Sequence, residues 1–236
     1  MMLSVEGIDV DIQASHILHK VSLNVGEHEV VCLVGRNGAG KTTTLRTIMG
    51  YLRPRSGRVS FLGKDLAGRG PHEIAQFGIG FSPEDSGIFP DLTVGENVEI
   101  STWTRPHGRP ARERLELAYS VFPVLRRYVK RKGTQISGGE RKMLSIARAL
   151  ALDPAMLLLD EPFEGLSPAI IPTVSESIGE ITKLGRSILL AESNIYHVPE
   201  FATRLYVIER GEIIFAGRPA DVERDEAVMR IIRGVA

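Results

Sequence analysis

Cysteine, excess charge and long apolar runs are all scarce in this sequence. Its one cysteine, Cys32, cannot form a disulfide within the chain. The 29 Lys and Arg residues balance the 29 Asp and Glu residues, so bulk charge does not indicate a nucleic-acid partner. No apolar run reaches the ~18 residues of a membrane-spanning helix, and the first residues lack the pattern of a secretory signal. We therefore expect a chain of the reducing cytosol that reaches a membrane only through another protein.

The sequence does have the composition of an ordinary folded domain, 43% hydrophobic and 25% charged. Three nearly continuous apolar runs are typical of parallel strands covered on both faces: residues 28–34 (HEVVCLV), 156–159 (MLLL) and 187–191 (SILLA). Each run leads into a polar or glycine-rich cluster and then into a helical pattern. This order predicts an α/β fold, in which a mostly parallel sheet is flanked by helices.

Two further regions are expected to surround this sheet. The residues before position 26, together with residues 204–215, have the alternation and turns of antiparallel strands, which predicts an N-terminal antiparallel β subdomain. Residues 94–132 have a helical pattern, and the C-terminal end predicts a short helix capped by Asp221. We expect a single domain, with a core of residues 1–93 and 153–236 and a helical lobe of residues 94–152.

Residues 35–42 (GRNGAGKT) follow the first apolar run and match the phosphate-binding pattern G-x-x-x-x-G-K-[ST]. Glycines in such a loop let backbone N–H groups surround phosphates, and the next helix directs its positive end at them. Lys41 would neutralise the β and γ oxygens, and Thr42 would be a ligand of Mg²⁺. A glycine-rich turn without a ligand is the alternative. The predicted nucleotide-binding residues are Gly35, Arg36, Asn37, Gly38, Ala39, Gly40, Lys41, Thr42 and Thr43.

The second apolar run ends in two carboxylates, Asp160 and Glu161 (MLLLDEP). In open α/β sheets, ligands bind at the carboxyl ends of the strands. We expect Asp160 to hold Mg²⁺ through water, and Glu161 to act as the base for the water that attacks the γ-phosphate. The alternative is an acidic helix cap ahead of Pro162.

A third motif, ISGGE, precedes the helical residues RKMLSIARALAL. Ser137 and Glu140 have the spacing of a capping box, which accounts for these two residues. It does not account for Gly138 and Gly139, because glycine in a helix costs ~1 kcal/mol relative to alanine. A helix start with bare backbone suits a closely approaching anion, so we predict a second γ-phosphate site here.

In this order the three motifs resemble those of the nucleotide-binding subunits of ABC transporters. GRNGAGKT resembles their Walker A motif, LLLDEP their Walker B motif and ISGGE their LSGGQ signature. GIFPDLTVGENV and DEPFEGLSP are most similar to the smaller ATPase of branched-chain amino acid importers, the LivF type. The resemblance covers essentially the whole chain. It implies a P-loop nucleoside triphosphatase core and a Mg²⁺-dependent, transport-coupled ATPase.

The resemblance also implies partners and a location. Two ATPase subunits, identical or related, would pack head to tail, so that Ser137 to Glu140 of one subunit contact the ATP bound by the other. Transmembrane permease subunits would dock on the helical lobe and residues 82–90 (SPEDSGIFP), and an extracytoplasmic solute-binding protein would act indirectly. The chain would lie peripherally on the cytoplasmic face of the cell membrane and would bind no nucleic acid.

Four residues depart from the family pattern. Ile12 stands where an aromatic ring usually stacks on adenine, and Glu84 stands where a glutamine helps to complete the metal site. Ser167 occupies an acidic position in the loop after the Walker B motif. Ser193 stands where the family has a His or Gln that contacts the γ-phosphate, and a serine is too short for the same direct contact. Glu84, Glu161 and Ser193 are thus the candidate catalytic residues, and Thr42, Glu84 and Asp160 the candidate metal ligands.

Two other functions stay open. The departures at Ile12 and Ser193 favour a slow or non-hydrolysing regulatory subunit, and a non-transport ABC ATPase acting on ribosomes or DNA is the second alternative. His16 and His19 are interpreted as surface residues on or beside a strand rather than a metal pair. Residues 126–132 (RRYVKRK) are interpreted as a solvated helix end, and Cys32 as an inert core residue.

Overall fold

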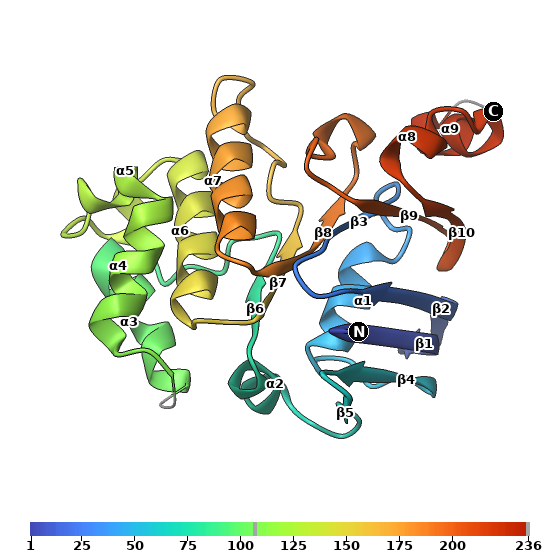
Figure 1. Ribbon diagram of the computed structural model, residues 1–236, viewed down its shortest axis with the longest axis horizontal. Coiled ribbons are helices and arrows are strands. Elements are labelled where there is room, and N and C mark those ends of the chain that lie inside the picture. The colour runs from blue at the N-terminus through green and yellow to red at the C-terminus, as the bar shows by residue number, and fades with distance from the viewer. Residues whose placement is uncertain (106–107, 235–236) are drawn as a thin grey trace. The chain divides into compact units, whose positions relative to one another are not determined.

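The chain divides into two units, and the structure, a computed structural model, describes residues 1–105 and 108–234 (Figure 1). The first unit comprises Met1–Ile74 and the chain from Ser187 onward, and the second comprises Ala75–Arg186. None of the helices within the described residues has both the length and the hydrophobicity of a membrane span.

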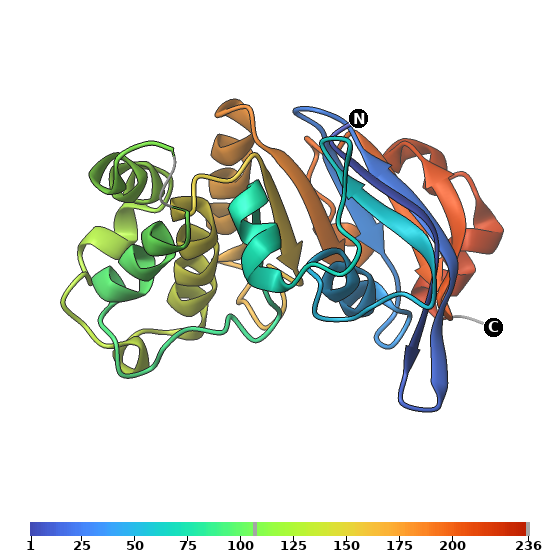
Figure 2. The same ribbon diagram turned by 90° about the horizontal axis from the view of Figure 1, so that it is seen from below.

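An antiparallel sheet forms the N-terminal part of the first unit. Its strand order is β2 (Ser15–Val25), β1 (Leu3–Ile12), β4 (Ser56–Phe61) and β5 (Lys64–Asp65). Every neighbouring pair is antiparallel, which confirms the predicted N-terminal subdomain for the residues before position 26. Its extension to residues 204–215 was wrong, because these residues form strands of the other sheet, where the first of them pairs in parallel. Figure 2 shows β1 and β2 as one long hairpin.

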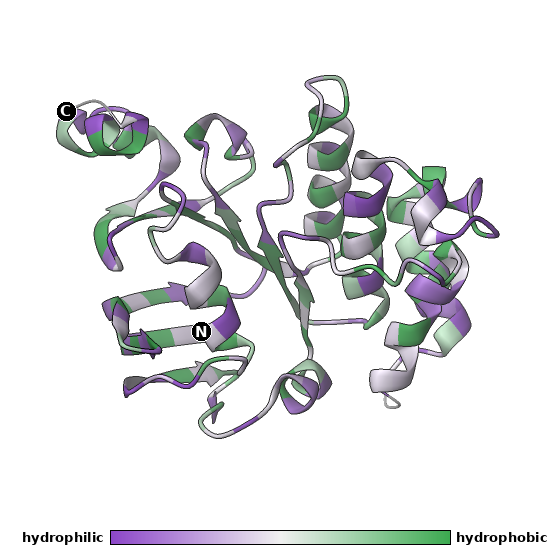
Figure 3. Ribbon diagram, turned by 180° about the vertical axis from the view of Figure 1, so that it is seen from behind, coloured by the Kyte–Doolittle hydropathy of each residue, from purple (hydrophilic) through white to green (hydrophobic). Residues whose placement is uncertain are grey.

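The other strands of the first unit carry the buried apolar runs. Strand β3 (Val30–Val34) pairs in parallel with β8 (Ser187–Glu192) and with β9 (Arg204–Glu209). Strand β10 (Glu212–Gly217) then pairs antiparallel with β9. All residues of β3 and β8 are buried, as their continuous apolar runs predict. In Figure 3 these strands are mostly hydrophobic, whereas the helices carry mixed bands.

Short helices connect and follow these strands. Helix α1 (Lys41–Ile48) follows β3, and α2 (Pro71–Phe77) contains the boundary between the units. The 3₁₀ helix η2 (Ile195–His197) follows β8. The C-terminal segment forms α8 (Pro219–Val222) and α9 (Glu226–Arg233).

The predicted cap of the C-terminal helix was wrong. Asp225, not Asp221, caps α9, because the Asp225 carboxylate accepts a hydrogen bond from the Val228 N–H at 3.1 Å. Asp221 lies inside α8, where its carboxylate pairs with the Arg218 guanidinium. Pro219 begins α8 six residues before Asp225, so the segment contains two helix starts and not one.

The second unit consists of a parallel strand pair and a set of helices. Strands β6 (Ile79–Ser82) and β7 (Met156–Asp160) are parallel, and β7 is fully buried. Helix α6 (Gly138–Ala151) is amphipathic, and its apolar face packs against α3, α4, α5 and β6. The remaining helices are α3 (Val94–Thr104), α4 (Ala111–Val121), α5 (Pro123–Arg126), η1 (Gly133–Gln135) and α7 (Ile171–Lys183).

Candidate active site

The glycine-rich loop lies between β3 and α1, as predicted. Gly40 is the N-cap of α1 with φ of 114°, a backbone conformation that favours glycine, and it supplies no side-chain cap. A Cβ atom on Gly35 would lie only 2.3 Å from the carbonyl oxygen of Ile208. Because Gly40 has no side chain, it cannot cap the N–H groups at the start of α1, and this helix terminus suits an anion.

Lys41, the first residue of α1, lies buried beneath this loop. Its Nζ donates hydrogen bonds to the carbonyl oxygens of Gly35 at 2.7 Å and Arg36 at 3.2 Å. Nζ also donates to Ser193 Oγ at 3.1 Å. These contacts fix the ammonium group at the loop, where a point charge can neutralise phosphate oxygens.

Ser193 lies directly after β8 and beside the loop. Its hydroxyl accepts the bond from Lys41 and donates to Asn37 Oδ1 at 2.6 Å. The register pairs Val34 with Glu192, which brings the end of β8 next to the start of the loop. The structure therefore brings Ser193 together with the predicted nucleotide-binding residues of the first unit.

Ile12 is the last residue of β1, pairs with Ser15 and is 38% exposed. Nearby on β2, His16 Nε2 lies 3.0 Å from Asp9 Oδ1, so this imidazole pairs with a carboxylate. The rings of His16 and His19 are in edge contact, with centroids 4.0 Å apart. An aliphatic side chain at Ile12 cannot supply the ring stacking that the family pattern implies.

The second unit holds the paired carboxylates. Asp160 ends β7, and Glu161 follows it; both are buried. Glu161 has φ of 48°, in the left-handed region that non-glycine residues rarely adopt. Strain of this kind at a strand end is typical of functional residues, because the surrounding structure must stabilise it.

A further carboxylate, Glu164, was not predicted from the sequence. Glu164 is exposed, but partial desolvation of its carboxyl group raises the pKa, and the negative charges of Glu161 and Glu84 raise the pKa further, while Lys142 lowers it. Lys142 Nζ also donates to the backbone oxygen of Glu84 at 2.6 Å. The only sequence signal for Glu164 is its place three residues after Glu161 in EPFEG. Glu164 thus adds a fourth carboxyl group to the three that were predicted.

The predicted metal ligands Thr42, Asp160 and Glu84 offer oxygen donors, the kind that Mg²⁺ prefers. Within residues 1–105 and 108–234, no group of three or more His, Cys, Asp or Glu residues is arranged to hold a metal ion. Mg²⁺ in nucleotide sites is usually held by one or two protein oxygens, with phosphate oxygens and waters completing its shell. The first unit offers the Thr42 hydroxyl as a donor of this kind, and the second unit offers the carboxylates of Asp160 and Glu84.

The signature helix begins as the capping box predicts. Ser137 Oγ accepts from the Glu140 N–H at 3.3 Å, and Glu140 Oε2 accepts from the Ser137 N–H at 2.7 Å. A Cβ atom on Gly138 would have no neighbour nearer than 3.9 Å, whereas one on Gly139 would lie 3.2 Å from Ile170. Packing within the chain thus gives a reason for glycine at 139 but none at 138.

Cys32 lies within β3, and burial together with the nearby charge of Glu192 raises the pKa of its thiol. A neutral buried thiol is a poor nucleophile and metal ligand, which agrees with its interpretation as a core residue.

These features define a P-loop nucleoside triphosphatase. They are a glycine-rich loop that leads from a buried strand into a helix, a lysine held within that loop, and carboxylates at the end of a second buried strand. Comparison with known proteins narrows the class. The chain belongs to the ABC transporter family, whose model matches residues 18–164.

Curated relatives align along most of the chain. The lipopolysaccharide export ATP-binding protein LptB of Haemophilus influenzae is 35% identical, over 99% of this chain and 97% of the relative. The probable branched-chain amino acid transport protein LivF of Archaeoglobus fulgidus is 32% identical, over 99% of each. The corresponding BraG protein of Pseudomonas aeruginosa is 37% identical, over 90% of this chain and 91% of the relative.

Solved structures agree with the fold. An ATP-binding cassette of an ABC transporter in its ADP conformation is 29% identical, with a TM-score of 0.86 over 99% of this chain and 98% of that chain. The predicted α/β P-loop fold and the predicted family are therefore confirmed. The chain is the ATP-binding subunit of a transporter and an ATPase of the ABC type.

Proposed function

We propose that this subunit hydrolyses ATP to drive import of branched-chain or related amino acids. The likeness to LivF and BraG, two proteins of branched-chain amino acid transport, carries this proposal. The stretches GIFPDLTVGENV and DEPFEGLSP, similar to the LivF type, support it further.

Export is a second candidate, favoured by the likeness to LptB, a lipopolysaccharide export protein. The two candidates differ in the transported molecule and in direction. A complex of this chain with transmembrane partner subunits, reconstituted in vesicles, distinguishes the two candidates. ATP-dependent uptake of labelled leucine in the presence of the solute-binding protein supports import. ATP-dependent extraction of lipopolysaccharide without leucine uptake would overturn it.

Within the site, each residue has a proposed role. Lys41 and the N–H groups of residues 35–43 bind the phosphates of ATP, and Thr42 and Asp160 hold Mg²⁺, with Glu84 as an additional ligand. When bound, Mg²⁺ neutralises charge on the β- and γ-phosphates. Glu161 accepts a proton from the attacking water, and the buried position of its carboxylate limits competing contacts with solvent.

One proposed partner, a second ATPase subunit, follows from the signature helix, and the others follow from the family resemblance. The first turn of α6, with bare backbone at Gly138, would bind the γ-phosphate of ATP held by a second subunit, identical or related. The subunit would lie peripherally on the cytoplasmic face of the membrane, docked on transmembrane permease subunits. A solute-binding protein would act indirectly.

Glu161→Gln tests the hydrolytic part of the proposal. The amide keeps the shape of the carboxylate but cannot accept the proton, so phosphate release should stop while ATP binding persists. Glu176→Gln, which removes the same charge from an exposed position on α7, is the matched control. Normal turnover in Glu161→Gln would remove Glu161 from the catalytic role. Wild-type ATP binding without turnover, with the partner subunits present, would favour the regulatory alternative.

A further inference from the structure

A buried carboxylate lies at the end of β8, immediately before Ser193. Glu192 is 1% exposed, and its backbone oxygen accepts a hydrogen bond from the Gly35 N–H at 3.2 Å. The side chain of Ser193 then bridges Lys41 and Asn37. The backbone of Glu192 thus joins the end of β8 to the first residue of the glycine-rich loop.

His197 holds this carboxylate from the next segment of chain. Its Nδ1 lies 3.2 Å from Glu192 Oε2, and its side chain is 24% exposed. An ionised carboxylate accepts hydrogen bonds only, so an imidazole that pairs with Glu192 in that form donates from Nδ1. A buried carboxylate that loses a donor is costly, because part of the offset to its desolvation is lost.

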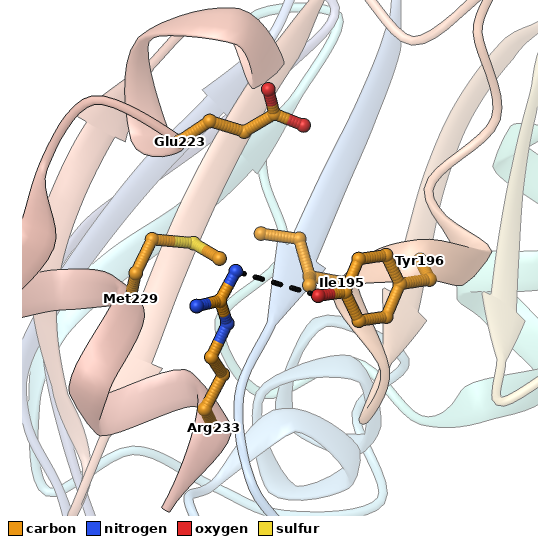
Figure 4. Close-up of a pocket in the computed structure, with 5 residues that line it drawn as sticks. All are labelled: Ile195, Tyr196, Glu223, Met229 and Arg233. Atoms are coloured by element: carbon orange, nitrogen blue, oxygen red, sulfur yellow. Dashed lines mark hydrogen bonds between the residues drawn. The ribbon is translucent and has the colours of Figure 1, made fainter. Parts of the chain in front are cut away.

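The segment that carries His197 is itself held in place. Asn194 caps η2, and its Oδ1 accepts from the Tyr196 N–H at 3.0 Å. The Tyr196 hydroxyl accepts a hydrogen bond from Arg233 Nη2 of α9 at 3.5 Å, across the pocket drawn in Figure 4. His197 therefore projects from a turn anchored at several points, which suits a residue that orients another group.

We propose that His197 is a positioning residue for ATP hydrolysis: through Glu192 it fixes the end of β8, so that the Ser193 hydroxyl bridges Lys41 and Asn37. This inference rests on the proposed placement of Lys41 and Ser193 at the phosphates. Loss of the His197 contact lets the Glu192 carboxylate turn away from its buried position and displaces the adjoining Ser193. Lys41 keeps its contacts with Gly35 and Arg36, so ATP still binds.

The first test is steady-state phosphate release from His197→Ala. We expect kcat to fall about tenfold, the lower end of the loss typical of removing such a supporting contact, with KM for ATP changed less than about twofold. His197→Asn should recover most of the rate, because its amide nitrogen takes a place close to that of Nδ1. His197→Gln should not, because its longer amide corresponds to Nε2. Equal rates for the Ala and Asn variants, or unchanged kcat in His197→Ala, would overturn the proposal.

The second test asks whether His197 acts through Ser193. In a Ser193→Ala background, His197→Ala should lower kcat no further, because the displaced hydroxyl is already absent. An undiminished loss in that background would show that His197 does not act through Ser193. Thermal unfolding of each variant identifies loss of rate through unfolding, and His72→Ala, an exposed histidine of α2, is the matched control.

Failure of this inference is distinct from failure of the proposed function. If Glu161→Gln stops hydrolysis but His197→Ala does not slow it, only the positioning role is wrong. If Glu161→Gln leaves hydrolysis intact, the proposed catalytic role of Glu161 is wrong, and the two tests of His197 still decide its role.

Discussion

The ammonium group of Lys41 donates a hydrogen bond to the hydroxyl of Ser193, with Nζ and Oγ 3.1 Å apart. The same hydroxyl donates to Asn37 Oδ1. A side chain that follows β8 is thereby hydrogen-bonded to two residues of the glycine-rich loop. A serine, too short for the direct γ-phosphate contact of the family's His or Gln, instead contacts the lysine that we propose to face the phosphates.

Lys41→Ala should abolish ATP binding. Nζ is the one point charge predicted to face the β and γ phosphates, and alanine also removes its contacts with Gly35, Arg36 and Ser193. Calorimetric titration with Mg-ATP measures the change. Lys64→Ala, which removes an exposed lysine from β5, should bind ATP as wild type does. Unchanged affinity in Lys41→Ala would contradict the assignment of this loop to phosphate binding.

Ser193→Gln should raise turnover with little change in ATP affinity. The longer amide can reach the γ-phosphate and hold the attacking water, and such fixed donors contribute up to ~3 kcal/mol, about a hundredfold in rate. Ser193→Ala should do the reverse, since it removes the contacts with Lys41 and Asn37. Phosphate release at saturating Mg-ATP compares the three proteins. Brisk wild-type turnover that the Gln variant does not improve would show that the serine is not limiting.

Local patterns in the sequence were sufficient for the elements that frame the site. The apolar runs of β3 and β8 are buried along their whole length, and the capping box of Ser137 and Glu140 has both of its hydrogen bonds. These features depend on residues close together in the chain, so their spacing alone specifies them. The prediction for the cap of α9 was wrong because two aspartates, four residues apart, both precede helical residues, and only backbone geometry distinguishes them.

Contacts between distant residues could not be predicted from spacing. Glu164 and Glu84 are eighty positions apart, yet their charges act on each other. Lys41 and Ser193 are separated by 152 positions and meet only because β3 and β8 are neighbours in the sheet. His197 and Glu192 are only five positions apart, yet their contact could not be predicted either. It joins a 3₁₀ turn to the end of a buried strand, and no residue spacing is typical of such a contact.

Glu164→Gln should make stability less sensitive to pH. Partial desolvation and the charges of Glu161 and Glu84 raise the pKa of Glu164 in the folded chain, although this residue is exposed, so the folded state binds this proton more tightly than the unfolded state does. The free energy of unfolding therefore contains a contribution that is largest below the ordinary Glu pKa, about 4.3, and is lost as pH rises through the raised value. The amide cannot ionise, so the variant should gain stability over wild type as the pH rises.

Urea unfolding of both proteins, from about pH 5 to about pH 8, measures that difference. Glu176→Gln on α7 removes a carboxylate whose side chain is exposed, so it should follow the wild-type profile. Parallel profiles for wild type and Glu164→Gln would contradict the raised pKa.

Gly138→Ala should stabilise the fold and still impair hydrolysis. A Cβ atom there meets nothing nearer than Arg141 Nη2 at 3.9 Å, and alanine in place of glycine favours a helix by ~1 kcal/mol. If the first turn of α6 binds the γ-phosphate held by a second subunit, the added methyl group lies where that phosphate approaches, and turnover should fall about tenfold or more. Thermal unfolding and phosphate release by the same preparation separate the two effects. Gly70→Ala, where a Cβ atom also has open space, should leave turnover unchanged. A Gly138→Ala protein that is more stable and fully active would show that no ligand comes close to this backbone, and that the capping box alone accounts for the motif.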